Sequence, residues 1–213
     1  MYGLTDKEIS ILKKLDIPQK IQDFLDRIPY NHELKGETCM SPKRVLEERR
    51  AHCIEAAMFA SIALMLQGRP PLVLSLKVTS ADDDYHAVAL FKENGYWGAI
   101  SKTNHAVLRY RDPIYKTIRE LALSYFHEYY LGSSGQKTLR GYTRPINLKK
   151  FGTKWVSEEM DLWKIAESIY VTKHIDIIPK GNEKLIRNAT PFERKVTNVE
   201  EWLRNENINQ MIK

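Results

Sequence analysis

The sequence predicts an α+β protein in which a cysteine-bearing helix packs on an antiparallel sheet. Through residue 67, apolar residues recur mainly at helical spacing. From residue 71 to 101 the pattern changes to three runs rich in branched and aromatic residues, separated by short polar connections. Short connections favour antiparallel pairing of consecutive strands. Helical patterns return after residue 115, so extra helices are expected at both ends of the core.

Length and composition indicate one domain with a substantial core, since 43% of the 213 residues are hydrophobic. We expect a single domain over 1–213, with the core at about 40–145, N-terminal helices at 5–29 and a C-terminal helical appendage at about 155–213. No apolar run of about 18 residues occurs, and the N-terminus lacks a signal-peptide core, so no membrane association is expected. The two cysteines are expected to be reduced in a cytoplasmic protein.

Four helices are expected before the sheet. The first two have helix-start signals, a capping-box pattern at Thr5 and a proline at position 18. A loop without periodicity follows at 30–42, and it could lie across a neighbouring site. The helices are predicted at 5–15, 18–28, 42–52 and 53–67.

Three strands and a mixed C-terminal half follow. The strands are predicted at 71–79, 85–91 and 96–101, with a hairpin turn at 92–95. After them we expect a turn at 110–113, a helix at 117–131, a strand at 136–142, a short helical turn at 147–151, and helices at 157–173 and 198–212.

Cys53 is the first candidate functional residue because it lies in the first turn of the most apolar helix. The free amides and positive dipole end of a helix favour a thiolate, which lowers the pKa of a thiol and makes it a better nucleophile. The alternative is a buried structural cysteine, since free cysteine is among the most buried residue types. The helix by itself leaves both interpretations open.

His86 is the candidate base because it begins the second strand after the cysteine helix. There it could accept the thiol proton and later protonate a leaving amine. The alternative is an ordinary edge-strand histidine. A metal site built from Cys39, His52, Cys53 and His86 would lack the close paired spacing of zinc sites, and we expect neither a metal nor a cofactor.

The order of these residues resembles the transglutaminase-like superfamily, whose members are relatives of papain-like cysteine proteases. The resemblance covers about residues 45–112 and rests on order and spacing. It implies a transglutaminase-like core, with Cys53 as nucleophile and His86 as acid and base in acyl transfer from an amide, peptide or isopeptide carbonyl. Such an enzyme would be a hydrolase or a transferase with a peptide or protein substrate. The matching segments are Cys53 with Glu55-Ala56-Ala57, His86-Ala87-Val88-Ala89 and Gly95-Tyr96-Trp97-Gly98-Ala99-Ile100.

The superfamily pattern also implies an aspartate near the end of the strand after the histidine, and Ser101 occupies that position here. A serine can accept a hydrogen bond from the imidazole but supplies no negative charge. Asn104 could substitute if the strand runs longer, whereas Asp112 lies too far along. The chain is therefore either an unusual catalyst or a catalytically impaired relative that uses its cleft for binding.

A basic band supports that binding alternative. Residues 101–156 contain eleven Lys and Arg against three acids, so the rest of the chain has a net negative charge although the total is +6. The band could contact an acidic partner, although a solvated charged surface is the commoner explanation. No RNA-binding signature, zinc finger or phosphate-binding loop accompanies it.

Neighbouring polar residues were assigned minor roles. We expect His52 to point away from the face of Cys53, because adjacent helical residues project in different directions. Glu55 could hydrogen-bond locally or orient a loop, although an exposed helical acid is the commoner case. Arg49, Arg50 and Lys102 could favour a thiolate or an anionic substrate.

Overall fold

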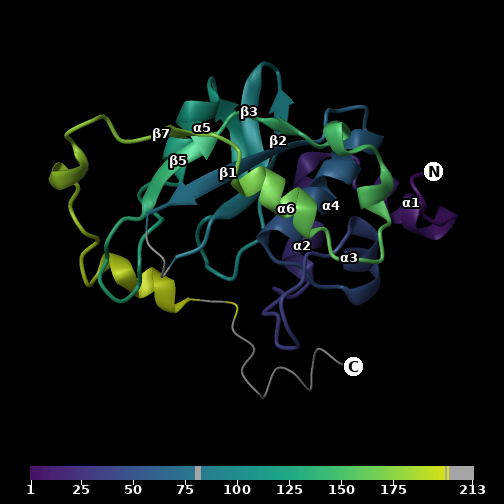
Figure 1. Ribbon diagram of the computed structural model, residues 1–213, viewed down its shortest axis with the longest axis horizontal. Helices are drawn as coiled ribbons and strands as arrows, with labels where there is room; N and C mark the ends of the chain where they lie inside the picture. The colour runs from purple at the N-terminus through teal and green to yellow at the C-terminus, as the bar shows by residue number, and fades with distance from the viewer. Residues whose placement is uncertain (80–82, 200, 202–213) are drawn as a thin grey trace.

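The computed structural model describes residues 1–79, 83–199 and 201, and within them it shows an α+β fold with helices on both faces of one sheet (Figure 1). The predicted fold class is confirmed. The helix predicted at 198–212 falls largely on residues outside the described ranges. No helix within the described ranges is long and apolar enough to cross a membrane.

The sheet has the order β4-β3-β2-β1-β5-β7, and the short β6 also pairs with β1. Its central meander is antiparallel, with Leu74 opposite Val88 and Leu90 opposite Ala99. The strands are β1 (Leu72–Val78), β2 (His86–Glu93), β3 (Tyr96–Ile100), β4 (Arg111–Tyr115), β5 (Leu139–Thr143), β6 (Ile146–Asn147) and β7 (His174–Asp176).

Helices cover the two faces of this sheet unequally. In one core cluster the helices α1, α2, α3 and α4 pack against one face of the sheet, and in a second cluster α5 packs against the other face. The α-helices are α1 (Asp6–Lys14), α2 (Pro18–Arg27), α3 (Pro42–Glu48), α4 (Cys53–Leu66), α5 (Ile118–Ser124) and α6 (Trp163–Tyr170). Short 3-10 helices are η1 (Leu148–Phe151), η2 (Lys154–Val156), η3 (Glu183–Leu185) and η4 (Glu193–Asn198).

The central helix is α4, which is apolar on every side and lies between the sheet and the other N-terminal helices (Figure 1). Residues 54–64 of this helix are all buried, which explains why it shows no amphipathic stripe in the sequence. The helix α4 packs mainly on β2, and the Sγ of its first residue, Cys53, lies 3.9 Å from the carbonyl of Tyr85, the residue before β2. The packing thereby brings the first residues of α4 and β2, Cys53 and His86, to one end of the core.

Two predicted helices are shorter than expected. The helix predicted at 117–131 ends at Ser124, because the chain tightens into i→i+3 bonds and the carbonyl of Tyr129 then accepts a bond from the amide of Thr138. The helix predicted at 157–173 begins only at Trp163, because the preceding residues bond to the main chain of Cys39.

Three short strands were not predicted, and one of them is the two-residue β6. The segment expected as a turn at 110–113 begins β4, an edge strand that tolerates its proline. Residues 174–176 form β7, which pairs with β5. At three residues β7 is too short to show an alternating pattern. The region after α6 therefore contributes to the sheet instead of being wholly helical.

Candidate active site

The structure brings His86, the first residue of β2, into contact with Ser101, the residue directly after β3. The His86 Nε2 lies 2.6 Å from the Ser101 Oγ, and that hydroxyl donates to the carbonyl of Leu108 at 2.8 Å. A hydroxyl has one proton to donate, so Ser101 must accept from His86. Nε2 then carries a proton, and in the neutral ring Nδ1 is the basic nitrogen.

Ser101 is only 1% exposed and is held by both sides of its backbone. The Gln22 amide accepts from the Ser101 N–H at 3.0 Å and donates to the Ser101 carbonyl at 2.9 Å. Asn104 lies in the following loop, where its carbonyl accepts from the main chain of Glu201. Among the described residues, Ser101 and not Asn104 is the partner of His86 Nε2. Asp112 lies on the exposed edge strand β4.

Cys53 is a half-buried free thiol at the N-terminus of α4. Burial alone would raise the pKa of this thiol, but hydrogen bonds and charge from His52 and His86 outweigh burial and lower the pKa from 9.0 to about 5. The helix N-terminus favours the same ionisation. At neutral pH Cys53 is therefore a thiolate.

His52 contacts Cys53, so the expectation that it points away was wrong. It is not a helical residue but the N-cap of α4, with an extended backbone at φ −98° and ψ −172°, and the helical spacing rule does not apply to it. Its Nε2 lies 2.9 Å from the carbonyl of Thr38 and 3.4 Å from the Glu55 Oε1. Burial opposes the charge, but the bond with Cys53 and the charge of Glu55 outweigh it and raise the His52 pKa from 6.5 to about 10.

Glu55 is fully buried and is not an exposed helical acid; it bonds locally and holds a loop, as in the alternative interpretation. Its carboxylate accepts hydrogen bonds from the Met40 N–H at 2.9 Å, the Thr38 hydroxyl at 2.8 Å and the His52 N–H at 2.9 Å. These donors come from the loop before α3 and from the start of α4. Glu55 thus supports His52, whereas a serine and not a carboxylate occupies the position that follows β3.

A pocket of about 540 Å³ opens beside Cys53. Tyr170 of α6 hydrogen-bonds with Cys53, and burial together with the nearby thiolate holds its pKa well above the usual value. This phenol therefore remains a proton donor. Its place in a predicted helix was the only indication of Tyr170 in the sequence. The lining holds three carboxylates and no Lys or Arg, and consists of Tyr30, Glu33, Glu37, Thr38, His52, Cys53, Ile54, Asp84, Tyr85, Trp163, Ala166 and Tyr170.

The other candidate residues lie apart from this pocket. Both cysteines are free, and Cys39 is buried. Within the described ranges, no group of three or more His, Cys, Asp or Glu could hold a metal ion. Lys102 is buried, and its Nζ bonds to the Ile28 carbonyl at 2.7 Å and to Glu201 at 3.0 Å. It therefore stabilises the fold at a distance from the pocket lining.

Several residues of the basic band are paired within the chain. Arg109 contacts Asp26 at 3.1 Å and Glu201 at 3.3 Å, and Arg111 pairs with Glu128. Arg111 also lies over the ring of Tyr125 at 4.1 Å. The charge available to an external partner is thus smaller than the sequence count.

No protein-family model matches the chain, and no curated protein matches it. A solved structure of LapG from Legionella pneumophila is similar with a TM-score of 0.38 and 14% identity, over 70% of this chain and 80% of that chain. This likeness is remote, so the chemistry of the site has to be judged from its own side chains. The fold and site together define an α+β protein with a thiolate between two histidines at the start of its central helix.

Proposed function

We propose that this protein is a cysteine-dependent acyl-transfer enzyme of transglutaminase-like type that acts on an amide or peptide carbonyl. The observation that carries the proposal is the site at the start of α4. There His52 and His86 lower the pKa of the Cys53 thiol to about 5, and the Nε2 of His86 is fixed by Ser101 at 2.6 Å. An activated nucleophile beside an oriented base is the arrangement that acyl transfer requires.

The first half of the reaction forms an acyl-enzyme. The Cys53 thiolate attacks the carbonyl carbon, and His86 in its protonated form gives a proton to the departing nitrogen as the C–N bond breaks. Water or an amine then attacks the thioester, His86 takes the proton of that nucleophile, and the thiolate leaves. Ser101 keeps Nδ1 directed at the reacting atoms throughout.

The oxyanion would be stabilised by two donors. One is the backbone N–H of Cys53, which lies in the first turn of α4 and has no partner within the helix. The other is the Tyr170 hydroxyl, which contacts the sulfur and keeps its proton. Donors placed before the reaction at a developing negative charge are among the largest contributions to catalysis.

His52 compensates for the charge that Ser101 does not supply. In a Cys–His–Asp arrangement the carboxylate stabilises the thiolate–imidazolium pair from the imidazolium side. Here the His52 imidazolium, supported by Glu55 at 3.4 Å, stabilises it from the thiolate side. The absent aspartate is thus compatible with an ionised nucleophile.

Acylation by p-nitrophenyl acetate tests this proposal without knowledge of the natural substrate. We expect a burst of p-nitrophenol and an intact mass increased by one acetyl group, located on Cys53. Cys39→Ser is the matched control and should retain both signals, because Cys39 is fully buried and does not line the pocket. Cys53→Ser should lose both, and His86→Asn should slow the burst. Acylation that is unaffected by His86→Asn would contradict the assigned base.

The second candidate is a noncatalytic module that binds an acidic partner, and the serine in place of a carboxylate favours it. Its remaining exposed cations lie around the start of α5 and after β5, namely Lys116, Arg119, Arg144, Lys149, Lys150 and Lys154. Salt-sensitive binding to polyglutamate that persists in Cys53→Ser, without any acylation of the unmodified protein, would favour this candidate.

A further inference from the structure

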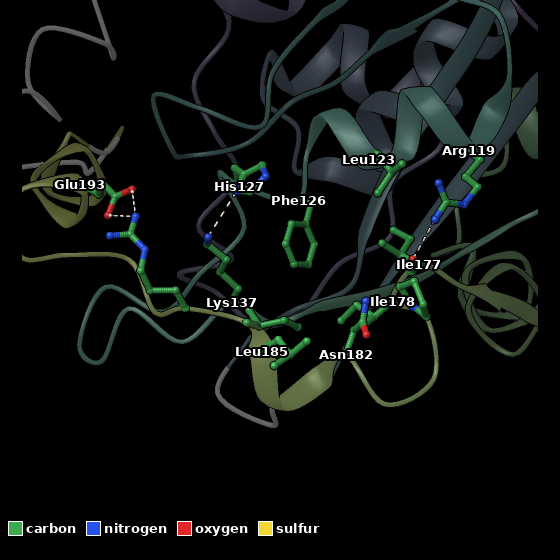
Figure 2. A pocket seen from close by; sticks show the side chains of 13 residues that line it. Arg119, Leu123, Phe126, His127, Lys137, Ile177, Ile178, Asn182, Leu185 and Glu193 are labelled. Carbon is green, nitrogen blue, oxygen red and sulfur yellow. Dashed lines mark hydrogen bonds and ion pairs between the residues drawn. The ribbon is translucent and has the colours of Figure 1, made fainter.

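A second pocket of about 500 Å³ lies between the segment after α5 and the chain after β7 (Figure 2). It shares no lining residue with the Cys53 pocket. Its walls are mainly apolar, and the ring of Phe126 lies at its centre in the view of Figure 2. The apolar lining consists of Leu123, Phe126, Ile177, Ile178, Pro179, Leu185 and Ile186.

The polar lining is cationic. It contains three cations, Arg119, Lys137 and Arg187, and only one carboxylate, Glu193. His127 and Asn182 complete it. That carboxylate already pairs with Arg187 at 3.2 Å. The Arg119 guanidinium donates to the Ile177 carbonyl at 3.1 Å, which fixes one wall (Figure 2).

Lys137 is the informative residue because it is only 7% exposed. Its Nζ lies 3.3 Å from the His127 Nδ1 and 5.8 Å from the centre of the Phe126 ring. Both partners are weak for an ammonium, since one is a nitrogen lone pair and the other a π face. Among the described residues, no carboxylate lies within ion-pair distance of the Lys137 Nζ, and Glu193, which interacts with its charge at longer range, is already paired with Arg187.

Burying a cation is costly unless a counter-charge accompanies it. Here the ammonium faces a pocket whose volume lies in the range of small-molecule sites, about 300–1,000 Å³. We propose that this pocket binds a small amphipathic carboxylate, with its anionic end on Lys137 and its apolar body against Phe126, Ile177 and Leu185. The single buried amine and mostly apolar walls fit this chemistry better than a polyanion, which needs several converging donors.

Titration calorimetry with octanoate and its neutral analogue octanamide tests the proposal on the full-length protein. We expect octanoate to bind at least about tenfold more tightly than octanamide, because only octanoate supplies the missing charge. Lys137→Met keeps the length of the side chain and should abolish this preference. Lys173→Met, which removes an exposed lysine outside the pocket, should preserve it. Equal affinity for both compounds, or no binding of either at millimolar concentration, would overturn the proposal.

Two further measurements locate the site and guard against misfolding. In amide NMR spectra, octanoate should perturb residues of 119–127 and 177–187, and perturbation confined to the Cys53 pocket would refute the assignment. Leu185 is 75% exposed, so Leu185→Glu should fold normally. Because it places a like charge at the wall, it should weaken octanoate and leave octanamide less affected. Unchanged octanoate affinity in this variant would also refute the proposal.

Discussion

Replacing His52 should raise the pKa of the Cys53 thiol, although the family resemblance gives His52 no role. His52→Asn is the appropriate change because His52 is the N-cap of α4 and asparagine is a preferred N-cap residue. The helix start is retained, while the imidazolium beside the sulfur is removed. Any change in thiol ionisation then reports the lost charge and hydrogen bond.

The magnitude follows from the two histidines around the sulfur. Together they outweigh the opposing effect of burial and lower the thiol pKa from 9.0 to about 5, and each contributes a hydrogen bond and a charge. With roughly equal shares, removing either one should leave a pKa of at least about 7, a loss of roughly 3 kcal/mol or more of thiolate stabilisation. At pH 6 the thiolate population would then fall from about nine-tenths to about one-tenth or less.

Iodoacetamide labelling across pH measures this ionisation directly. The inflection of the rate profile gives the thiol pKa, whereas a rate at one pH does not, because a more basic thiolate is also more nucleophilic. We expect inflections near 5 in the unmodified protein, at about 7 or higher in His52→Asn and in His86→Asn, and above 9 in the double variant, where only the effect of burial remains. An unchanged inflection in His52→Asn, with the full rise above 9 already in His86→Asn, would refute the two-histidine account.

Three other predictions follow from the same site. Between pH 6.5 and 9.0 the folded thiolate–imidazolium pair of Cys53 and His52 holds one proton, as do the unfolded thiol and imidazole, so the pair's contribution to stability should be flat there. This contribution should be lost as pH falls toward 5, where only the folded thiol is ionised, and as pH rises toward 10, where only the folded His52 is charged. The plateau should appear in the difference between the unfolding free energies of the protein and of Cys53→Ala, measured with urea across pH. A slope of that difference between pH 6.5 and 9.0 would contradict the pairing. Ser101→Ala should lower the free energy of unfolding in urea by about 1–3 kcal/mol and slow acylation, because it leaves the His86 N–H and the Leu108 carbonyl without their partner. An unchanged free energy of unfolding would show that water replaces the hydroxyl. A cationic methanethiosulfonate should modify Cys53 about tenfold faster than an anionic one. This preference should shrink when amides replace the pocket carboxylates Glu33, Glu37 and Asp84. An equal rate for both reagents would exclude a negative pocket.

The residues around Ser101 could be predicted because they depend on local order. The hairpin of β2 and β3 pairs Ala89 with Ile100, so the residue after Ile100 must lie near the first residues of β2. Cys53 and His86 each begin an element, and helix and strand starts are readable from the sequence. The meander and the helix packed on it followed from the same patterns.

His52, Glu55 and Tyr170 could not be assigned from the sequence, because their roles depend on tertiary structure. The direction of His52 follows from the extended backbone of a cap, which helical spacing does not describe. Glu55 is buried because a loop before α3 supplies its donors, and loops carry no periodic signal. Tyr170 reaches the sulfur only because α6 packs beside the start of α4.

Glu201 joins parts of the molecule that are far apart in sequence. Its carboxylate accepts from the main chain of Tyr30 at 2.9 Å and from the buried Lys102 at 3.0 Å, and its carbonyl lies 2.6 Å from the His32 Nε2. The loop that lines the Cys53 pocket is thus anchored by a residue about 170 positions later. A protease cut or a shortened recombinant version that removes Glu201 would leave the buried Lys102 ammonium without its carboxylate partner and loosen this loop. Trimming the tail would therefore alter the reactivity of a cysteine that the cut never approaches in sequence.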